Sequence, residues 1–287
     1  SIALALSMTL AGAENTTAAE MRSVLHYPTA DDALHRAAGE LQTALARPVD
    51  DPAEPDQRAF ELTVANRLWV QDGFPLRDRF LTVCDDHYGA GVGLVDFQRA
   101  PAAARERING WVGEQTRGKI PDLLSPDAIR PQTTLILTNA VYFLAQWAKP
   151  FEEDQTTDRP FHVPGVGEVQ VPTMRQSERL AYAADDQAQF LQLPYTGRRQ
   201  VCEIVLPRER DGIAALTTAL TRDRLDTWRQ AARPRPVDLE LPRLDITGKF
   251  ELADLLADLG MPSAFNAGRA DFTGISTAAP LVIDRVI

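Results

Sequence analysis

The chain has 287 residues, of which 44% are hydrophobic and 24% are charged, and its formal net charge is -10. This composition is typical of a globular protein with a sizeable core. The negative charge argues against nucleic acid or an anionic membrane as the main partner, and no apolar stretch is long enough to span a bilayer. Two cysteines, Cys84 and Cys202, cannot form a disulfide framework, so we expect two unpaired, partly buried thiols.

The first part of the chain predicts mainly helices. The first of them is apolar almost all round, as in a buried helix. Thr17 and Glu20 have capping-box spacing and would open the second helix. Pro101 stands at a favoured first helical position, and Gly118 would end that helix. Helices are expected over 2–10, from Thr17 to about Tyr27, over 31–46, over 75–89 and over 101–118.

Two long segments alternate as β-strands do, and each carries an asparagine on its apolar side. These are Asn66, in the segment around 60–71, and Asn139, in the segment 133–151. The opposite side of the second segment is more mixed. An unpaired carboxamide on a buried face costs roughly 1–3 kcal/mol, so Asn139 needs a partner. The apolar residues on these two sides are Phe60, Leu62, Val64, Leu68 and Val70, and Leu135, Leu137, Val141, Phe143 and Trp147.

The second half of the chain predicts mainly strands. Short alternating segments over 159–176, 179–197 and 199–209 are typical of antiparallel strands. A helical stretch over 212–230 and a further strand follow. Because helices come mainly early and strands later, the fold class predicted is α+β rather than α/β. A last helix over 249–261 would turn Leu252, Leu255, Leu256 and Leu259 inward, with Gly260 as its cap.

Motifs for catalysis or cofactor binding are absent or weak. The segment GAGVGL at 89–94 lacks the GxGxxG spacing and leads into a strand, so a glycine-rich turn is favoured over a nucleotide site. No P-loop, HExxH or GxSxG motif occurs. Asp85, Asp86 and His87 could be metal ligands, but a solvated helix end is the favoured interpretation. The sequence therefore predicts no enzyme, no catalytic residue, no metal and no cofactor.

Several motifs, in order along the chain, resemble the serpin family. INGWVGEQTRGKIPDLL (108–124) resembles the family's helix F, and LTNAVYFLAQWAKPF (137–151) resembles strand 3 of its central sheet A. The N-terminal SIALALSMTLAGAENTTAAEM resembles helices B and C. VQVPTMRQ, LQLPYTG and CEIVLPRE resemble strands of sheets C and B, and LELPRLDIT, LADLGMPSAF and ADFTGIS resemble later motifs. The resemblance covers essentially the whole chain.

The resemblance implies the architecture of a single serpin-like domain over 1–287. Many helices in its N-terminal part would pack on a large mixed sheet A, with smaller antiparallel sheets B and C. Strands near 60–71, 92–97 and 134–147 would be neighbours in sheet A, with helix 101–118 across its face. The last strand of sheet A is expected near 237–246.

The resemblance also implies that the chain is an internal fragment, truncated at both ends. The family has a helix before the position of Ser1. After the position of Ile287 it has a histidine-containing strand, the reactive-centre loop and the last strands of sheet B. The residue that would set protease specificity is therefore not in this sequence.

Three residues match functional positions of the family. Asn139 matches the asparagine of the shutter, which ties strand 3A to a serine-bearing helix B and to a histidine on strand 5A, and Ser1 matches a shutter serine. We therefore expect the side chain of Asn139 to be buried and hydrogen-bonded towards the N-terminal helix, near Ser1. Trp147 matches the breach tryptophan, where the reactive loop begins to insert. Judged from the residues alone, a satisfied core asparagine and a packing tryptophan remain open.

The function implied is suicide-substrate inhibition of a serine or, less often, a cysteine protease. The loop would be cleaved, form an acyl-enzyme and insert between strands 3A and 5A. The alternative is a non-inhibitory serpin, a carrier, chaperone or storage protein, and the hinge that distinguishes the two lies beyond Ile287. The stretch 34–56 is not basic, so heparin binding is not expected. The full-length protein would be a monomer, and either a secreted or a cytoplasmic location fits.

Overall fold

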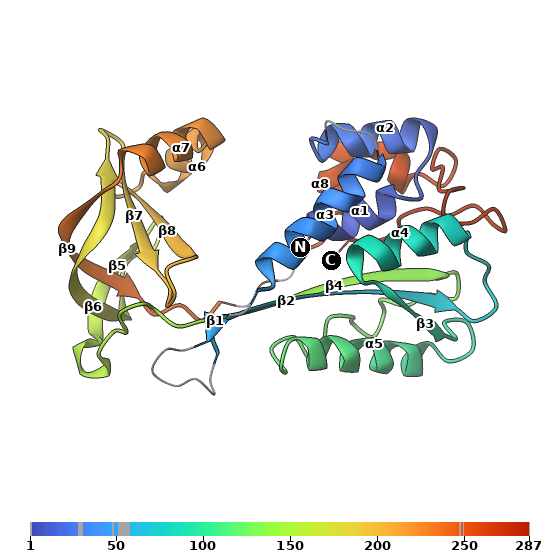
Figure 1. The fold of residues 1–287 in the computed structure, drawn as a ribbon, viewed down its shortest axis with the longest axis horizontal. Helices are drawn as coiled ribbons and strands as arrows, with labels where there is room; N and C mark the ends of the chain where they lie inside the picture. Colours follow the sequence, from blue (N-terminus) through green and yellow to red (C-terminus); the bar gives the residue numbers. More distant parts are fainter. Residues whose placement is uncertain are drawn as a thin grey trace. The chain divides into compact units, whose positions relative to one another are not determined.

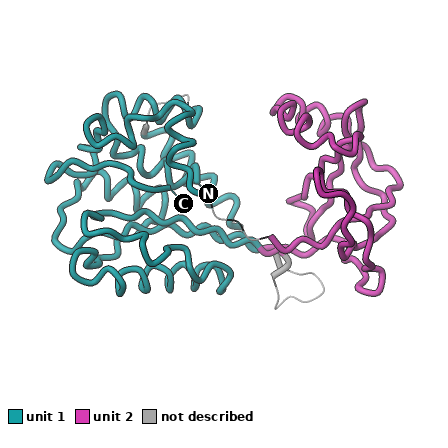
Figure 2. Tube along the Cα trace, turned by 180° about the vertical axis from the view of Figure 1, so that it is seen from behind, with its two compact units in different colours: residues 1–47, 61–143, 248–287 teal, residues 48–60, 144–247 magenta. Residues whose placement is uncertain are grey.

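The computed structural model describes residues 2–27, 31–47, 49–50, 58–246, 248 and 250–286 (Figure 1). The chain folds into two compact units, coloured separately in Figure 2. Unit 1 comprises 1–47, 61–143 and 248–287, and unit 2 comprises 48–60 and 144–247. Unit 1 is therefore built from three separate stretches of the chain.

Unit 1 has helices on both faces of a sheet. In Figure 1, α5 covers one face and the remaining helices of the unit lie over the other. This arrangement confirms the α+β class. The helical elements are α1 (Ile2–Leu10), α2 (Asn15–Val24), α3 (Asp31–Leu45), α4 (Asp78–Tyr88), α5 (Pro101–Gln115), α8 (Ala253–Asp258) and the 3-10 helix η2 (Pro262–Phe265).

The sheet is organised around β2 (Arg58–Gln71). β3 (Gly91–Val95) pairs with it in parallel, and β4 (Leu135–Ala145) pairs with it as well. β4 is antiparallel to β2, because Asn139 contacts Asn66 whereas Thr134 bonds to Gln71. The short β1 (Val49–Asp50) pairs with the start of β2. The neighbours expected for sheet A are thus confirmed for these strands.

Alternation along β2 and β4 divides the apolar residues of unit 1 between two cores. Leu68 and Val70 join the core beneath α1, α2, α4 and α8, with Leu135 and Leu137 packed against it. Trp69 joins the second core, beneath α5, where Ile136 packs. Helix α5 therefore lies across the sheet, as expected.

The N-terminal helices are held by the late segment around residue 271. Asn15 Nδ2 donates to Asp271 Oδ2 at 2.7 Å, and the backbone N–H of Asp271 donates to Thr17 Oγ1 at 3.0 Å. Glu20 accepts from the backbone and the hydroxyl of Ser263. The capping box expected at Thr17 and Glu20 is therefore wrong: α2 already begins at Asn15, and both side chains serve tertiary contacts instead.

Gly12 allows the end of α1 to approach this late segment closely. A Cβ at Gly12 would lie 2.1 Å from Ile275 Cγ1 and 2.9 Å from the backbone nitrogen of Ile275. One at Gly274 would lie 2.8 Å from the carbonyl oxygen of Gly12. Only glycine lets the two backbones meet at this distance.

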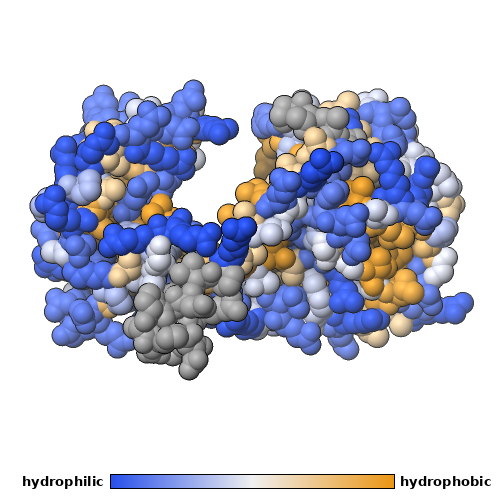
Figure 3. Space-filling view, in the orientation of Figure 1, coloured by the Kyte–Doolittle hydropathy of each residue, from blue (hydrophilic) through white to orange (hydrophobic). Residues whose placement is uncertain are grey.

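The last predicted helix is shorter than expected and buries only part of its leucines. α8 ends at Asp258, and Gly260, with φ +120°, follows it. Leu256 is buried, but Leu255 is 55% and Leu259 61% exposed, so their inward placement was wrong. A one-sided helix buries a single stripe, and Leu255 and Leu259 share an i, i+4 row beside the buried one. In Figure 3, hydrophobic residues are visible on several parts of the surface drawn.

Unit 2 contains a five-stranded antiparallel sheet with the order β5-β6-β7-β8 and β9 paired to β6. The long β6 pairs with β5, β7 and β9, so strands that were expected in two separate sheets, B and C, belong to one sheet. The strands are β5 (Thr157–Val163), β6 (Gly167–Ala184), β7 (Ala188–Pro194), β8 (Val201–Pro207) and β9 (Arg233–Pro242). The helical elements are η1 (Glu153–Gln155), α6 (Ile213–Ala219) and α7 (Arg222–Ala231).

The last strand of sheet A, expected near 237–246, is not formed there. β9 ends at Pro242 and pairs with β6, with Thr173 opposite Pro242 and Tyr182 opposite Arg233. The physical reason is burial, because Leu239 packs with Leu180 in the core of unit 2.

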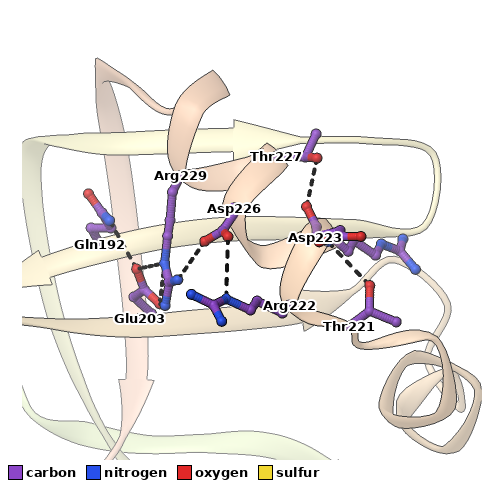
Figure 4. A network of polar contacts seen from close by, with 9 residues as sticks. Gln192, Glu203, Thr221, Arg222, Asp223, Asp226, Thr227 and Arg229 are labelled. Carbon is purple, nitrogen blue, oxygen red and sulfur yellow. Dashed lines mark hydrogen bonds and ion pairs between the residues drawn. The ribbon is translucent and has the colours of Figure 1, made fainter. Parts of the chain in front are cut away.

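Helix α7 is fixed to the sheet of unit 2 by Arg229 (Figure 4). Its Nε and Nη2 donate to the two carboxylate oxygens of Glu203 at 2.9 and 2.7 Å, and its Nη1 donates to Asp226 at 2.9 Å. The bond from Arg229 lowers the pKa of Glu203 below its usual value. A two-pronged contact of this kind fixes orientation as well as distance.

Both cysteines are free, Cys84 buried and Cys202 half-buried, which confirms the expectation for the two thiols. Burial raises the pKa of Cys84 to about 12. Within the described parts of the chain, none of the helices reaches the length and hydrophobicity needed to cross a membrane.

Candidate functional site

Asn139 lies on β4 with its side chain directed at the neighbouring strand β2. Its Nδ2 donates to Oδ1 of Asn66 at 2.6 Å. The two asparagines that the sequence places on apolar strand faces are therefore bonded to each other. Asn66 is 5% exposed, whereas Asn139 is only half-buried.

Asn66 connects this pair to α3 and α4. Its Nδ2 donates to Oε1 of Gln42 at 2.9 Å and to the carbonyl oxygen of Tyr88, also at 2.9 Å. Gln42 donates in turn to the carbonyl oxygen of His87 at 3.2 Å. A chain of amides thus crosses from β4 through β2 to two helices. We call Asn139, Asn66, Gln42, Tyr88 and His35 the Asn139 cluster.

The inner end of the Asn139 cluster is the hydroxyl of Tyr88. It lies 2.7 Å from Nδ1 of His35, which is 1% exposed. Burial raises the pKa of Tyr88 above its usual value, and a hydrogen bond with Ser7 opposes that rise. Ser7 lies on α1 and also contacts the hydroxyl of Tyr27 at 2.6 Å. The cluster therefore reaches α1 through Tyr88 and Ser7.

The carbonyl oxygen of Asn139 is buried and has no hydrogen-bond partner among the described residues. The expected hydrogen bond from Asn139 towards the N-terminal helix is not the one formed, since its amide donates to Asn66 on β2. The reason is the strand register, which sets Asn139 beside Asn66. Ser1, the expected shutter partner, lies outside the described residues. Asn139 therefore keeps one buried acceptor available for a partner.

An open surface hollow of about 720 Å³ adjoins the helical end of the Asn139 cluster. Gln42 and Tyr88 contribute to its wall, together with Val64 and the end of α4 from Asp85 to Gly89. Asp85, Asp86 and His87 are thus wall residues. The described residues contain no group of three histidine, cysteine or acidic side chains arranged to hold a metal.

Trp147 belongs to unit 2, whereas Asn139 belongs to unit 1. β4 ends at Ala145, and Trp147 forms an isolated antiparallel bridge with Tyr195. The two rings are stacked, with centroids 4.6 Å apart, and Phe151 meets Trp147 edge-on at 6.3 Å. Burial, followed by interaction with Cys202, raises the pKa of Tyr195 to about 12. Trp147 is therefore held as one face of an aromatic stack.

The second edge of β4 is a potential site for an added strand. β4 pairs with β2, and no further strand pairs with it among the described residues. Near its end, Phe143 is 49% and Leu144 40% exposed. A strand edge presents backbone donors and acceptors in a row, so it can accept an extended segment.

The sequence identified Asn66 and Asn139 but missed the partners of Asn66. Gln42 and His35 lie on the amphipathic helix α3 at i, i+7 spacing, which places them on one face. The role of Tyr88 could not be predicted from its side chain, because Tyr88 lies at the end of a helix and accepts from Asn66 through its backbone carbonyl oxygen. The spacing of His35 and Gln42 was the one signal that could have revealed the cluster.

Comparison with known proteins agrees with this arrangement over the whole chain. The profile of the family described as Serpin (serine protease inhibitor) matches residues 1–287. An uncharacterized serpin-like protein of Thermococcus kodakarensis is 38% identical, covering 100% of this chain and 64% of the relative. The leukocyte elastase inhibitor of Xenopus laevis is 34% identical, covering 100% of this chain and 76% of the relative. The chain thus spans about two thirds to three quarters of the length of these relatives.

Solved structures show the same fold. Ovalbumin from emu (Dromaius novaehollandiae) superposes with a TM-score of 0.91 at 28% identity, covering 99% of this chain and 76% of that one. Cleaved Serpin 42Da superposes with a TM-score of 0.89 at 29% identity, covering 99% and 74%. With a family match from the first residue to the last and the strand neighbours of β2, the chain belongs to the serpin family.

Proposed function

We propose that the full-length protein is a suicide-substrate inhibitor of a serine or cysteine protease. The observation that carries the proposal is the open edge of β4, which stands beside the Asn139 cluster and has no second strand partner among the described residues. Among the relatives, the leukocyte elastase inhibitor carries an inhibitory activity in its name. The protein is proposed to act as a single domain, as a monomer, and without catalysing a reaction of its own.

In the proposed mechanism, the protease cleaves a reactive loop of the full-length protein and becomes acylated by it. The freed loop then inserts as a new strand along β4. β4 has 11 residues, so insertion would form on the order of ten backbone hydrogen bonds. At about 1 kcal/mol each, these bonds contribute on the order of 10 kcal/mol to driving the transition.

Asn139 is proposed to act as the latch of this edge. Its amide is bonded to Asn66, and its buried carbonyl oxygen has no partner among the described residues. Ser1 and the histidine that the family resemblance implies on strand 5A are the proposed donors to this oxygen. A hydrogen bond contributes about 1 kcal/mol net and can be exchanged for another. Packed apolar side chains, in contrast, would have to move apart before any new contact could form. Trp147, stacked on Tyr195, is proposed to mark the breach where insertion begins.

A non-inhibitory role, as a carrier, chaperone or storage protein, is the second candidate. It is favoured by the similarity to ovalbumin, whose name mentions no protease, at a TM-score of 0.91. The two roles place the same demands on the described residues and differ in the hinge of the reactive loop. Either a secreted or a cytoplasmic location fits the proposal, and the acidic balance disfavours heparin as an activator.

The proposal is tested with the full-length protein. It is incubated with trypsin-like, chymotrypsin-like, elastase-like and papain-like proteases and then analysed by denaturing electrophoresis. A band at the summed mass of the two proteins, stable in denaturant, is the expected result. Catalytically inactive protease, with its nucleophile replaced by alanine, is the matched control and should give no such band. Cleavage by every protease without a stable complex would reject inhibition in favour of the second candidate.

A further inference from the structure

Two arginines lie against one tryptophan on the α5 side of the unit 1 sheet. The guanidinium carbon of Arg67, on β2, is 4.7 Å from the ring centroid of Trp69 and 5.7 Å from that of Trp111. The guanidinium carbon of Arg107, on α5, is 5.9 Å from the Trp69 ring. Arg107 Nη1 also donates to the carbonyl oxygen of Leu94 at 2.8 Å. Sheet and helix thus bring two cations to the same indole.

Among the residues that the structure describes, no carboxylate balances the charge of this pair. Within the described parts of the chain neither Arg67 nor Arg107 forms an ion pair, although the protein has 40 acidic and 30 basic residues. Nε of Arg67 is buried and has no hydrogen-bond partner there. The indole ring attracts a cation but offers no acceptor. A partly buried guanidinium normally has an anionic or hydrogen-bonding partner.

Glycines on β3 leave room beside these cations. Gly91 is opposite Arg67 and Gly93 is opposite Trp69 in the parallel pairing of β2 and β3. A Cβ at Gly93 would lie 2.7 Å from Trp69 and 3.2 Å from Nε of Arg67, so the indole packs directly on that glycine. A Cβ at Gly91 would meet nothing within 4 Å. The space next to Arg67 is therefore open at Gly91, within the glycine-rich segment 89–94.

We propose that Arg67 and Arg107 form a binding site for a small oxyanion, a carboxylate or a phosphate, entered beside Gly91. An oxyanion has at least two oxygens, which match the parallel N–H groups of a guanidinium. Bound here, it accepts from N–H groups of Arg67 and Arg107 and balances their positive charge. The indoles of Trp69 and Trp111 reduce the local dielectric, which strengthens the attraction. This site is independent of protease inhibition.

The test is a titration of the chain with inorganic phosphate and, separately, with acetate, each against sodium chloride at equal ionic strength. Tryptophan emission is the readout, since Trp69 and Trp111 lie at the site. A saturable change with phosphate or acetate, absent with chloride, is expected, and the comparison of the two shows which oxyanion is preferred. A response identical to that of chloride for both anions would overturn the proposal.

Two variants locate the binding. Arg107→Gln removes one cation and should weaken binding about tenfold or more. Arg105→Gln makes the same charge change on a different face of α5, and this variant should bind the anion as the wild type does. Gly91→Val keeps both cations, suits a strand and fills the entrance, so it should abolish the saturable change. Equal weakening by the two arginine variants, or unchanged binding by Gly91→Val with a native circular dichroism spectrum, would refute the site.

Discussion

Asn139 and Asn66 form a hydrogen bond of 2.6 Å between adjacent strands, β4 and β2. Because Asn66 also donates to Gln42 and to the backbone of Tyr88, the bond connects the strand with the open edge to helices α3 and α4. Movement of β4 away from β2 would therefore break a side-chain bond in addition to the backbone ladder.

Loss of this bond should destabilise unit 1. Asn139→Ala is expected to lower the free energy of unfolding by about 1–3 kcal/mol, because Asn66 Oδ1 loses its donor while buried. Asn66→Ala should cost at least as much, and the double variant should cost less than the sum, with a coupling of about 0.5–3 kcal/mol. Urea unfolding measures all three variants. Strict additivity would show that the bond contributes nothing.

The same substitution should ease opening of the sheet in the full-length protein. With the latch removed, Asn139→Ala is expected to polymerise faster on mild heating than the wild type, as followed by native electrophoresis. Gln132→Ala, at an exposed position before β4, is the control and should polymerise at the wild-type rate. Equal rates for all three proteins would count against the latch.

Replacement of two adjacent leucines of α8 by alanine should cause very different losses of stability. Leu256→Ala is expected to cost about 2–4 kcal/mol, because Leu256 is 8% exposed and packs in the core of unit 1. Leu255→Ala, at a position 55% exposed, should change stability by less than about 0.5 kcal/mol. Thermal and urea unfolding give both values. Similar losses for the two variants would mean that the helix faces the core differently.

Asp185 should make unit 2 sensitive to acid. Burial would raise its pKa, but bonds from the backbone of Gln187 and Ala188 and from Arg224 and Trp228 outweigh that and hold the pKa at about 2. The unfolded value is about 3.9. A carboxyl with a depressed folded pKa stabilises the fold above the unfolded pKa, and this contribution is lost as the pH falls through the folded one.

The measurement compares wild type and Asp185→Asn by urea unfolding between pH 7 and pH 2. The wild type should be more stable at pH 7, and the difference should shrink between about pH 4 and pH 2. Asp186→Asn, at the exposed neighbouring position, is the control and should follow the wild-type curve. A stability difference that stays constant down to pH 2 would contradict the assignment.

Arg229 should not be replaceable by lysine. Arg229→Lys removes the two-pronged contact with Glu203 and is expected to cost about 0.5–1 kcal/mol, since both groups are partly exposed. Arg222→Lys is the matched change on the same helix. Arg222 is 91% exposed and reaches Asp226 only at 3.9 Å, so it should cost nothing measurable. Equal values for the two variants would show that the geometry of the Glu203 contact is irrelevant.

The resemblance to the serpin family predicted the sheet neighbours and the helix across them. The strand alternation predicted the two asparagines. It could not predict which amide bonds to which, because that depends on the register of β4 against β2 and on two helices distant in sequence. The helical pattern of 249–261 wrongly placed Leu255 and Leu259 inward, because a leucine-rich helix does not reveal how wide a stripe its neighbours can cover. The strand near 237–246 was assigned to sheet A, yet its apolar residues pack in unit 2. Periodicity shows which side of an element is buried, but not against which sheet.

The contacts between α2 and the segment around Asp271 have a consequence for synthesis on the ribosome. Asn15 and Asp271 are separated by 256 residues, which at ~5–20 residues per second takes roughly 10–50 s to translate. Until then the late segment that contacts Gly12, Thr17 and Glu20 has not been synthesised. Residues 144–247 of unit 2 emerge from the ribosome in the meantime. The nascent N-terminal helices must therefore remain incompletely packed through most of translation. A binding partner of exposed nascent apolar helices, such as a ribosome-associated chaperone, would meet this chain in that interval.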